Sequence, residues 1–303
     1  MRLATSFAVA VAIGTAAVLS GCGGSDDKSP DLLLVSTRDG DYAIYAMNAG
    51  GGNQERLTDA EGDPSSPQGL FFQIEPAWSP DGRQIAFASK RRGSFDVFVM
   101  NADGTGTRRL TSTSGDEGHP TWSPDGKRIA FSRGAPGDLY VMNADGSSVR
   151  PIADGPADET QPAWSPDGRS IAYVSRTPGT QAQELWVMRA DGSEPRRLTR
   201  LAATSSSPAW SPDGTRLAFS TNNGANPFDI YFVVVDGKGL QRVTMTPDDT
   251  FDPAWSPDGT TIAFSEGGSI FSVESQGDPR MLTSPSGNDS SPAWNPSTPR
   301  KTD

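Results

Sequence analysis

The sequence predicts an all-β protein built from six copies of one four-stranded unit, and three observations support that prediction. The heptapeptide Pro-Ala-Trp-Ser-Pro-Asp-Gly recurs along the chain with small changes. The 33 glycines and 25 prolines among 303 residues indicate many tight turns. A tryptophan returns every 39 to 46 residues, at positions 78, 122, 164, 210, 255 and 294. A period of about 40 to 45 residues is typical of a β-propeller blade.

Each repeat contains four short apolar segments, taken here from the first complete copy. Residues 77–78 (AW) lead into Ser-Pro-Asp-Gly, which favours a type I turn. Residues 84–88 (QIAFA) place large side chains on one face and alanines on the other, which suits close packing between sheets. Residues 96–100 (DVFVM) are apolar on both faces, so we expect both faces to be covered. Residues 109–111 (RLT) complete the blade.

The order of the segments predicts how the ring closes. The chain begins with the second, third and fourth segments of a blade, near residues 32–36, 43–47 and 56–58, and ends with a first segment around Trp294. We therefore predict a six-bladed β-propeller of four-stranded antiparallel blades, closed by a blade shared between the N- and C-termini, which removes free sheet edges. It spans residues 31–296, a polar tail follows at 297–303, and each repeated tryptophan fills the core between blades.

The first thirty residues read as a targeting segment. Residues 1–21 contain Arg2 and an uncharged run over 7–19 that is too short to span a bilayer, as in a secretory signal peptide. The tetrapeptide LSGC at 19–22 resembles a bacterial lipobox, in which cleavage precedes a cysteine that is then diacylated. We expect lipidation at Cys22, a flexible tether over 22–30, and a lipid-anchored protein of the cell envelope facing the periplasm or the exterior. The alternative is an ordinary signal followed by a free cysteine.

Charge and composition exclude several classes of function. A formal net charge of −11 argues against a nucleic-acid partner, which requires a basic face. One cysteine excludes an intramolecular disulfide and a multi-cysteine zinc site. One histidine excludes a site that needs several imidazoles. We expect no cofactor, no metal centre and no catalytic residue.

The repeat PAWSPDG–IAF–IYVMNADG–RLT resembles that of the TolB-type propeller family, a relative of the WD-repeat propellers, and the resemblance covers residues 31–296. It implies the six-bladed fold. TolB itself is a soluble periplasmic protein of the Tol–Pal envelope system with an additional N-terminal α/β domain. Here, residues 23–30 alone separate Cys22 from the first strand. We expect a lipoprotein that lacks the additional domain, and the Tol–Pal role does not transfer.

The two faces of the ring are expected to differ. The SPDG and NADG turns of one face barely vary, and their Asp and Asn residues are explained as turn formers. The loops of the other face vary widely, which often marks a binding face, and most of them are acidic. These loops are residues 59–75, 112–119, 154–161, 200–207, 245–252 and 284–291. They form either an acidic funnel for a basic peptide, an amine or a divalent cation, or a surface that keeps the protein soluble. The candidate partner-binding acids are Asp116, Glu117, Asp158, Glu159, Asp248 and Asp249.

A second group of candidates immediately precedes the proline of each repeat and is expected to point toward the channel mouth. These residues are Glu75, His119, Gln161, Ser207, Asp252 and Ser291. Two carboxylates, an imidazole and an amide in one ring are able to hold a metal ion or a cluster of ordered waters. Residues 70–72 (LFF), in the longest loop, either contact a partner or fold over their own blade.

These features favour a non-enzymatic, monomeric binding scaffold that takes an envelope protein or peptide as its partner and reaches the membrane through its lipid. One alternative is a propeller that binds cell-wall carbohydrate, with Phe71, Phe72, Phe228 and Phe251 as candidate contacts. Another is a metal-dependent propeller enzyme of lyase or hydrolase type. No G-x-S-x-G motif is present, and His119 is the single histidine available to a catalytic triad.

Overall fold

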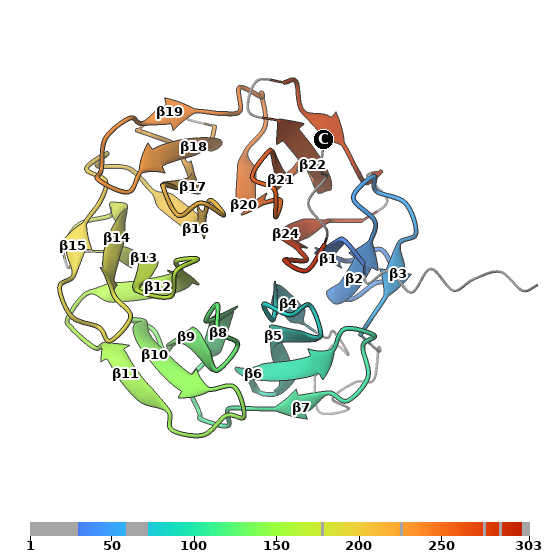
Figure 1. Ribbon diagram of the computed structural model, residues 1–303, viewed down its shortest axis with the longest axis horizontal. Helices are drawn as coiled ribbons and strands as arrows, with labels where there is room; N and C mark the ends of the chain where they lie inside the picture. Colours follow the sequence, from blue (N-terminus) through green and yellow to red (C-terminus); the bar gives the residue numbers. More distant parts are fainter. Residues whose placement is uncertain are drawn as a thin grey trace, which may run out of the picture.

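The computed structural model describes residues 30–58, 72–176, 179–224, 227–274, 277–284 and 287–298. Within these ranges, twenty-four strands form six four-stranded antiparallel sheets that stand around a central axis (Figure 1). The predicted six-bladed propeller, including its shared blade, is confirmed. The predicted signal peptide, Cys22 with nearly all of its tether, most of the 59–75 loop with residues 70–71, and the last five residues of the tail lie outside the described ranges.

Each blade runs from an innermost strand at the axis to a short outer strand at the rim (Figure 1). The first three blades are β24 (Ser290–Trp294), β1 (Leu32–Ser36), β2 (Ala43–Met47) and β3 (Glu55–Arg56); β4 (Gln73–Trp78), β5 (Gln84–Arg92), β6 (Ser94–Asn101) and β7 (Arg108–Arg109); and β8 (Glu117–Trp122), β9 (Arg128–Arg133), β10 (Asp138–Asn143) and β11 (Arg150–Ala153). The other three are β12 (Asp158–Trp164), β13 (Ser170–Arg176), β14 (Gln183–Arg189) and β15 (Arg196–Arg197); β16 (Ser205–Trp210), β17 (Arg216–Thr221), β18 (Asp229–Val234) and β19 (Gln241–Arg242); and β20 (Thr250–Trp255), β21 (Thr261–Glu266), β22 (Ser269–Glu274) and β23 (Arg280–Met281).

The SPDG turn, which follows five of the six innermost strands, owes its shape to its own side chains. In the first copy, the Ser79 hydroxyl donates to Asp81 Oδ1 at 2.6 Å, and the same oxygen accepts the Arg83 N–H at 3.1 Å. Gly82 takes φ = 68°, a left-handed conformation that glycine adopts without a steric penalty. The Ser79 hydrogen bond also lowers the pKa of Asp81. The prediction that these acids form turns is confirmed by this geometry.

The hydrophobic core lies between blades, as predicted from the segments that are apolar on both faces. Trp78 is buried beside Leu33 and Ile44 of the neighbouring blade and beside Ile85 and Phe87 of its own. Its indole N–H donates to the carbonyl of Ala293 at 3.2 Å. Each blade therefore buries apolar side chains on both faces, and an isolated blade would expose them to water.

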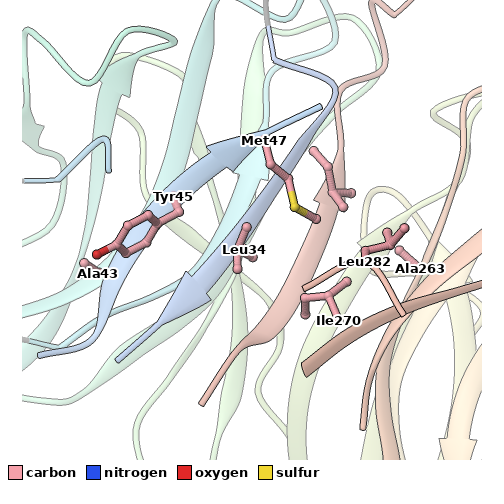
Figure 2. Packing of buried hydrophobic residues seen from close by; sticks show 8 residues of the cluster. Leu34, Ala43, Tyr45, Met47, Ala263, Ile270 and Leu282 are labelled. Atoms are coloured by element: carbon pink, nitrogen blue, oxygen red, sulfur yellow. The ribbon is translucent and has the colours of Figure 1, made fainter. Parts of the chain in front are cut away.

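The shared blade closes the ring. Strand β1 pairs with β24, with Leu32 opposite Trp294. Leu34 and Met47 from this blade pack against Ile270 and Leu282 of the last blade (Figure 2).

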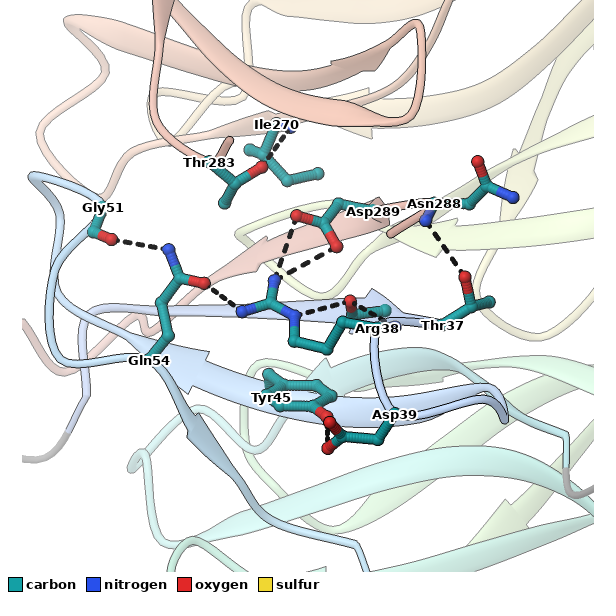
Figure 3. Close-up of polar contacts among 11 residues, drawn as sticks. Thr37, Arg38, Asp39, Tyr45, Gly51, Gln54, Ile270, Thr283, Asn288 and Asp289 are labelled. Carbon is teal, nitrogen blue, oxygen red and sulfur yellow. Dashed lines mark hydrogen bonds and ion pairs between the residues drawn. The ribbon is translucent and has the colours of Figure 1, made fainter. Parts of the chain in front are cut away.

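A polar contact on the loop side reinforces this seam. Arg38 Nη2 donates to both carboxylate oxygens of Asp289 at 3.1 and 3.0 Å, and the Asn288 N–H donates to Thr37 Oγ1 at 3.0 Å (Figure 3). Residues more than 250 positions apart are thus joined by both apolar and charged contacts.

The innermost strands begin earlier than the sequence indicates. Expected loops such as 112–119 and 154–161 give way to strand at Glu117 and Asp158. In β8, the register shifts between Gly118 and Thr121, which marks a β-bulge at His119 and Pro120. A proline has no N–H for the ladder, so a bulge is where an inner strand accommodates it.

None of the described residues forms a helix long and apolar enough to cross a membrane.

Candidate functional site

The six residues that precede the repeat prolines line one cavity on the propeller axis, together with those prolines. The cavity has a volume of about 310 Å³. All six residues are non-glycine, yet each lies in the left-handed region with φ between 50° and 57°. This conformation costs a non-glycine residue roughly 1–2 kcal/mol, so it persists because the bulge in each inner strand imposes it. The ring residues are Glu75, His119, Gln161, Ser207, Asp252 and Ser291.

Alternate members of this ring hold the next member through its backbone. Glu75 Oε2 accepts the N–H of His119 at 2.5 Å, and Gln161 Oε1 accepts the N–H of Ser207 at 2.8 Å. The Asp252 carboxylate likewise accepts the N–H of Ser291. The ring therefore divides into three pairs, in which an oxygen-bearing side chain is fixed against the following blade.

The Glu75–His119 pair is also an ion pair. His119 Nε2 lies 3.0 Å from Glu75 Oε1, and Nδ1 lies 3.0 Å from the Ser132 hydroxyl. Burial alone lowers the pKa of His119, but the charge and hydrogen bond of Glu75 outweigh it, so this pKa is raised. Burial raises the pKa of Glu75, yet the His119 charge leaves it lowered. Both directions favour a carboxylate facing an imidazolium.

The opposite side of the ring carries a carboxylate without a basic side chain among its hydrogen-bond partners. Ser207 Oγ donates to Asp252 Oδ1 at 2.8 Å, and Ser291 Oγ lies 3.4 Å from Oδ2. Burial raises the pKa of Asp252, the nearby charge of Glu75 adds to this, and the hydrogen bonds reduce it in part. The cavity thus has an ion pair on the side of His119 and a serine-bonded carboxyl group on the side of Asp252.

The predicted loop acids are divided by the structure into buried and exposed groups. Glu117 is fully buried in strand β8, paired with Arg133 at 2.7 Å, and Glu159 in β12 is 8% exposed. Asp116 and Asp249 are exposed, and each accepts a backbone N–H at the start of a third strand, from Phe95 at 2.9 Å and Phe228 at 2.7 Å.

Asp158 does the same for Gly137 at 2.7 Å, whereas Asp248 is exposed on its loop. Most of these acids therefore stabilise the loop face through a hydrogen bond to a backbone N–H or an ion pair.

The sequence did not reveal Ser132 as a neighbour of the ring. Its hydroxyl lies beside His119 Nδ1 and 3.2 Å from the carbonyl of Gly118. Ser265, at the same position of another repeat, bonds the carbonyl of Phe251 at 3.2 Å in the same way. Strand β9 pairs Ser132 with Gly118, the residue before His119. The alternation of side chains along β9 was the only sequence signal for this contact, and the register that completes it comes from the structure.

The described candidate carbohydrate contacts pack against other aromatic rings of the protein. Phe228 and Phe251 have ring centroids 5.0 Å apart, and Phe72 stacks on Tyr42 at the same separation. All three phenylalanines are half-buried. Among the residues that the structure describes, no three His, Cys, Asp or Glu side chains are grouped to hold a metal ion.

Radial antiparallel blades around an axial cavity with a polar ring define a closed β-propeller. Within that class, the TolB beta propeller domain matches residues 65–182 and 160–299, so the chain belongs to this family.

Individual relatives cover limited parts of the chain or show the fold alone. The Tol-Pal system protein TolB of Syntrophus aciditrophicus is 46% identical over 39 residues, which are 13% of this chain and 9% of that protein. The first curated relatives are matched over 9–27% of their own lengths.

Two solved structures illustrate the range of proteins with this fold. TolB from Acinetobacter baumannii superposes with a TM-score of 0.73 at 20% identity, covering 88% of this chain and 67% of that one. An oligogalacturonate lyase in complex with manganese superposes with a TM-score of 0.57 at 14% identity, covering 82% and 73%.

Proposed function

We propose that the chain is a non-enzymatic binding scaffold of the cell envelope, whose axial cavity and acidic loop face receive a protein or peptide partner. The observation that carries this proposal is the convergence of one polar side chain from each of six blades on a single cavity. Membership of the TolB beta propeller family and the likeness to a Tol-Pal system protein support an envelope location and a protein partner.

The size and charge of the cavity limit what enters it. A volume of about 310 Å³ is at the small end for ligand pockets, so a protein partner inserts a single side chain or a chain terminus rather than a broad surface. The carboxyl group of Asp252 already accepts hydrogen bonds from two serines, and its oxygens favour a donor group from the ligand. The surrounding acidic loops attract a partner with a basic surface.

The contacts of His119 favour binding over acyl transfer. Glu75, His119 and Ser132 are hydrogen-bonded in sequence, as an acid, a base and a nucleophile would be. However, Ser132 is 6% exposed and does not line the cavity. The raised pKa of His119 favours the imidazolium, the form that has no lone pair with which to remove the serine proton. The hydroxyl serves instead as an acceptor for His119 and a donor to Gly118.

Site-specific photocrosslinking tests the proposed cavity. A photoreactive amino acid at Gln161 places the probe in the ring, and one at Val149, which is 40% exposed beside an NADG turn, provides the control. We expect a discrete protein adduct from position 161 in intact cells and its loss when Ser291→Phe fills the cavity. The same adducts from both positions, or an adduct that survives Ser291→Phe in a folded variant, would contradict the proposal.

The lipid anchor is proposed from the LSGC segment at residues 19–22. Cys22→Ser removes the thiol that would be acylated, so the protein should leave the membrane fraction and lose incorporation of labelled palmitate. If the wild type and Cys22→Ser both stayed in the membrane fraction and neither incorporated label, lipidation would be contradicted. The cavity proposal would be unaffected.

A further inference from the structure

An ion pair between the third and fourth strands recurs around the propeller. An arginine on the fourth strand pairs in register with a residue of the third strand. Its guanidinium binds a buried carboxylate that lies two residues before that third-strand residue. Arg109 binds Asp96 at 2.7 Å, and Arg197 binds Glu184 at 2.7 Å. Arg242 binds Asp229 at 2.5 Å in the same arrangement. These carboxylates are 1–3% exposed, so the guanidinium is what compensates their charge.

Two blades lack the arginine, and they differ in how they do so. In the blade of β20–β23, Met281 replaces the arginine and Ser269 replaces the carboxylate, so both charges are absent. In the blade of β8–β11, Pro151 takes the arginine position opposite Tyr140, but the carboxylate of Asp138 is retained two residues before that tyrosine. In the blade of β8–β11, the carboxylate of Asp138 is therefore present without the arginine that pairs with it in other blades.

Glu159, on the first strand of the next blade, also lacks the arginine that pairs with its equivalents in other blades. Glu117 and Asp289, two residues before their ring residues, pair with Arg133 and Arg38. The equivalent Glu159 is 8% exposed, and its Oε2 is buried without a hydrogen-bond partner.

The arginine nearest in sequence register to Glu159 is engaged elsewhere. Arg176 binds Asp158 Oδ2 at 2.6 Å instead. The Glu159 N–H donates to the carbonyl of Gly137 at 2.8 Å, which places Glu159 beside the start of β10 and Asp138. Burial raises the pKa of Glu159, and the charges of Asp138, Asp158 and Asp154 raise it further.

We propose that Asp138, Asp154 and Glu159 form a rim subsite that binds an arginine side chain presented by a polypeptide partner. The subsite lies where β10 begins and β11 ends, on the outer part of the ring next to β12 (Figure 1). Pro151 and Asp154 are exposed, so the position vacated by the arginine is reached from solvent. The guanidinium occupies the place that Arg109, Arg197 and Arg242 fill from within their own blades.

The chemistry of the sibling blades identifies the ligand. The same strand register holds a guanidinium against a carboxylate at 2.5–2.7 Å in three blades, so the backbone geometry already suits that group. A planar guanidinium donates to several oxygens that are spread apart, whereas an ammonium is a single compact charge. The described acids are not grouped tightly enough to surround a metal ion.

Titration with L-argininamide, followed by amide chemical shifts of the uniformly ¹⁵N-labelled propeller, tests the subsite. We expect saturable shifts at Gly137, whose N–H binds Asp158, and at Leu139, with an affinity about fivefold above that for L-lysinamide. The Val97 amide beside Asp96 should not shift, because Arg109 occupies that site. Arg109→Ala opens the sibling site and serves as the positive control.

Two variants separate occupation of the subsite from a nonspecific charge effect. Pro151→Arg combined with Ala153→Thr recreates the sibling segment and should abolish the shifts at Gly137, because the chain fills its own site. Asp138→Asn, which keeps the side-chain shape, should weaken argininamide about tenfold. It also provides the test if the double variant does not fold.

Three results would overturn the inference. These are the absence of saturable shifts when Arg109→Ala responds, unchanged binding in Asp138→Asn, and tighter binding of CaCl₂ than of argininamide at the same amides. The inference concerns the rim, and shifts at ring amides such as that of Ser207 would report the cavity instead. Failure of one site is therefore distinguishable from failure of the other.

Discussion

Asp289→Asn removes one charge from the ion pair that closes the ring. The Asp289 side chain is 0% exposed and that of Arg38 is 17% exposed, with two hydrogen bonds of 3.0–3.1 Å between them (Figure 3). Breaking a buried pair by removing one partner costs roughly 3–5 kcal/mol. Arg38 keeps contacts with Ser36 and Gln54 and some access to water, so we expect a cost near the lower end, about 3 kcal/mol.

Urea unfolding followed by tryptophan fluorescence measures this cost directly, and a thermal melt should show a fall in Tm of roughly 6–12 °C. Glu194→Gln is the matched control, because its pair with Arg189 at 3.0 Å joins side chains that are 67% and 61% exposed. Such a pair contributes about 0–1 kcal/mol. If Asp289→Asn were no more destabilising than Glu194→Gln, the seam would not depend on this contact.

Three further predictions concern the ring and the core. The pKa of His119, measured by NMR, should lie above 6.5 and fall in Glu75→Gln. The stabilisation from this pair should be complete between about pH 4.5 and 6.5, and be lost as pH rises through the raised pKa of His119 or falls through the lowered pKa of Glu75. Gly118→Ala should lower the His119 pKa by a smaller amount, because the added Cβ would lie 2.9 Å from Glu75 Oε2 and displace that carboxylate from its contacts with His119. Phe87→Ala, at a fully buried position between blades, should lower the free energy of unfolding by about 3–5 kcal/mol, whereas Met245→Ala, at a 78% exposed side chain, should leave it unchanged.

Each of these has a result that contradicts it. A His119 pKa that is the same in wild type and Glu75→Gln would mean that the ion pair does not form in solution. A large loss of stability in Gly118→Ala would show that the backbone, rather than the carboxylate, had to move. Equal effects of Phe87→Ala and Met245→Ala on urea unfolding would contradict an inter-blade core.

The sequence by itself determined the repeat, the number of blades and the shared blade. Those features follow from local chemistry that recurs along the chain, such as the Ser79 and Asp81 turn, which is found in five repeats, and the tryptophan, which is found in six. It also determined which residue of each repeat faces the axis, because a proline at a fixed position in every inner strand repeats the same bulge.

Only the tertiary structure decided which of the acids are available to a ligand. Glu117 and Asp248 both read as loop acids, yet the first is buried against Arg133 and the second is exposed. Likewise, the sequence contains Pro151 and Asp138 without indicating that one stands where an arginine should meet the other. Turns depend on residues adjacent in the chain, whereas the compensation of a charge depends on a side chain from another strand or blade. That partner is set by register and ring closure, which no single repeat encodes.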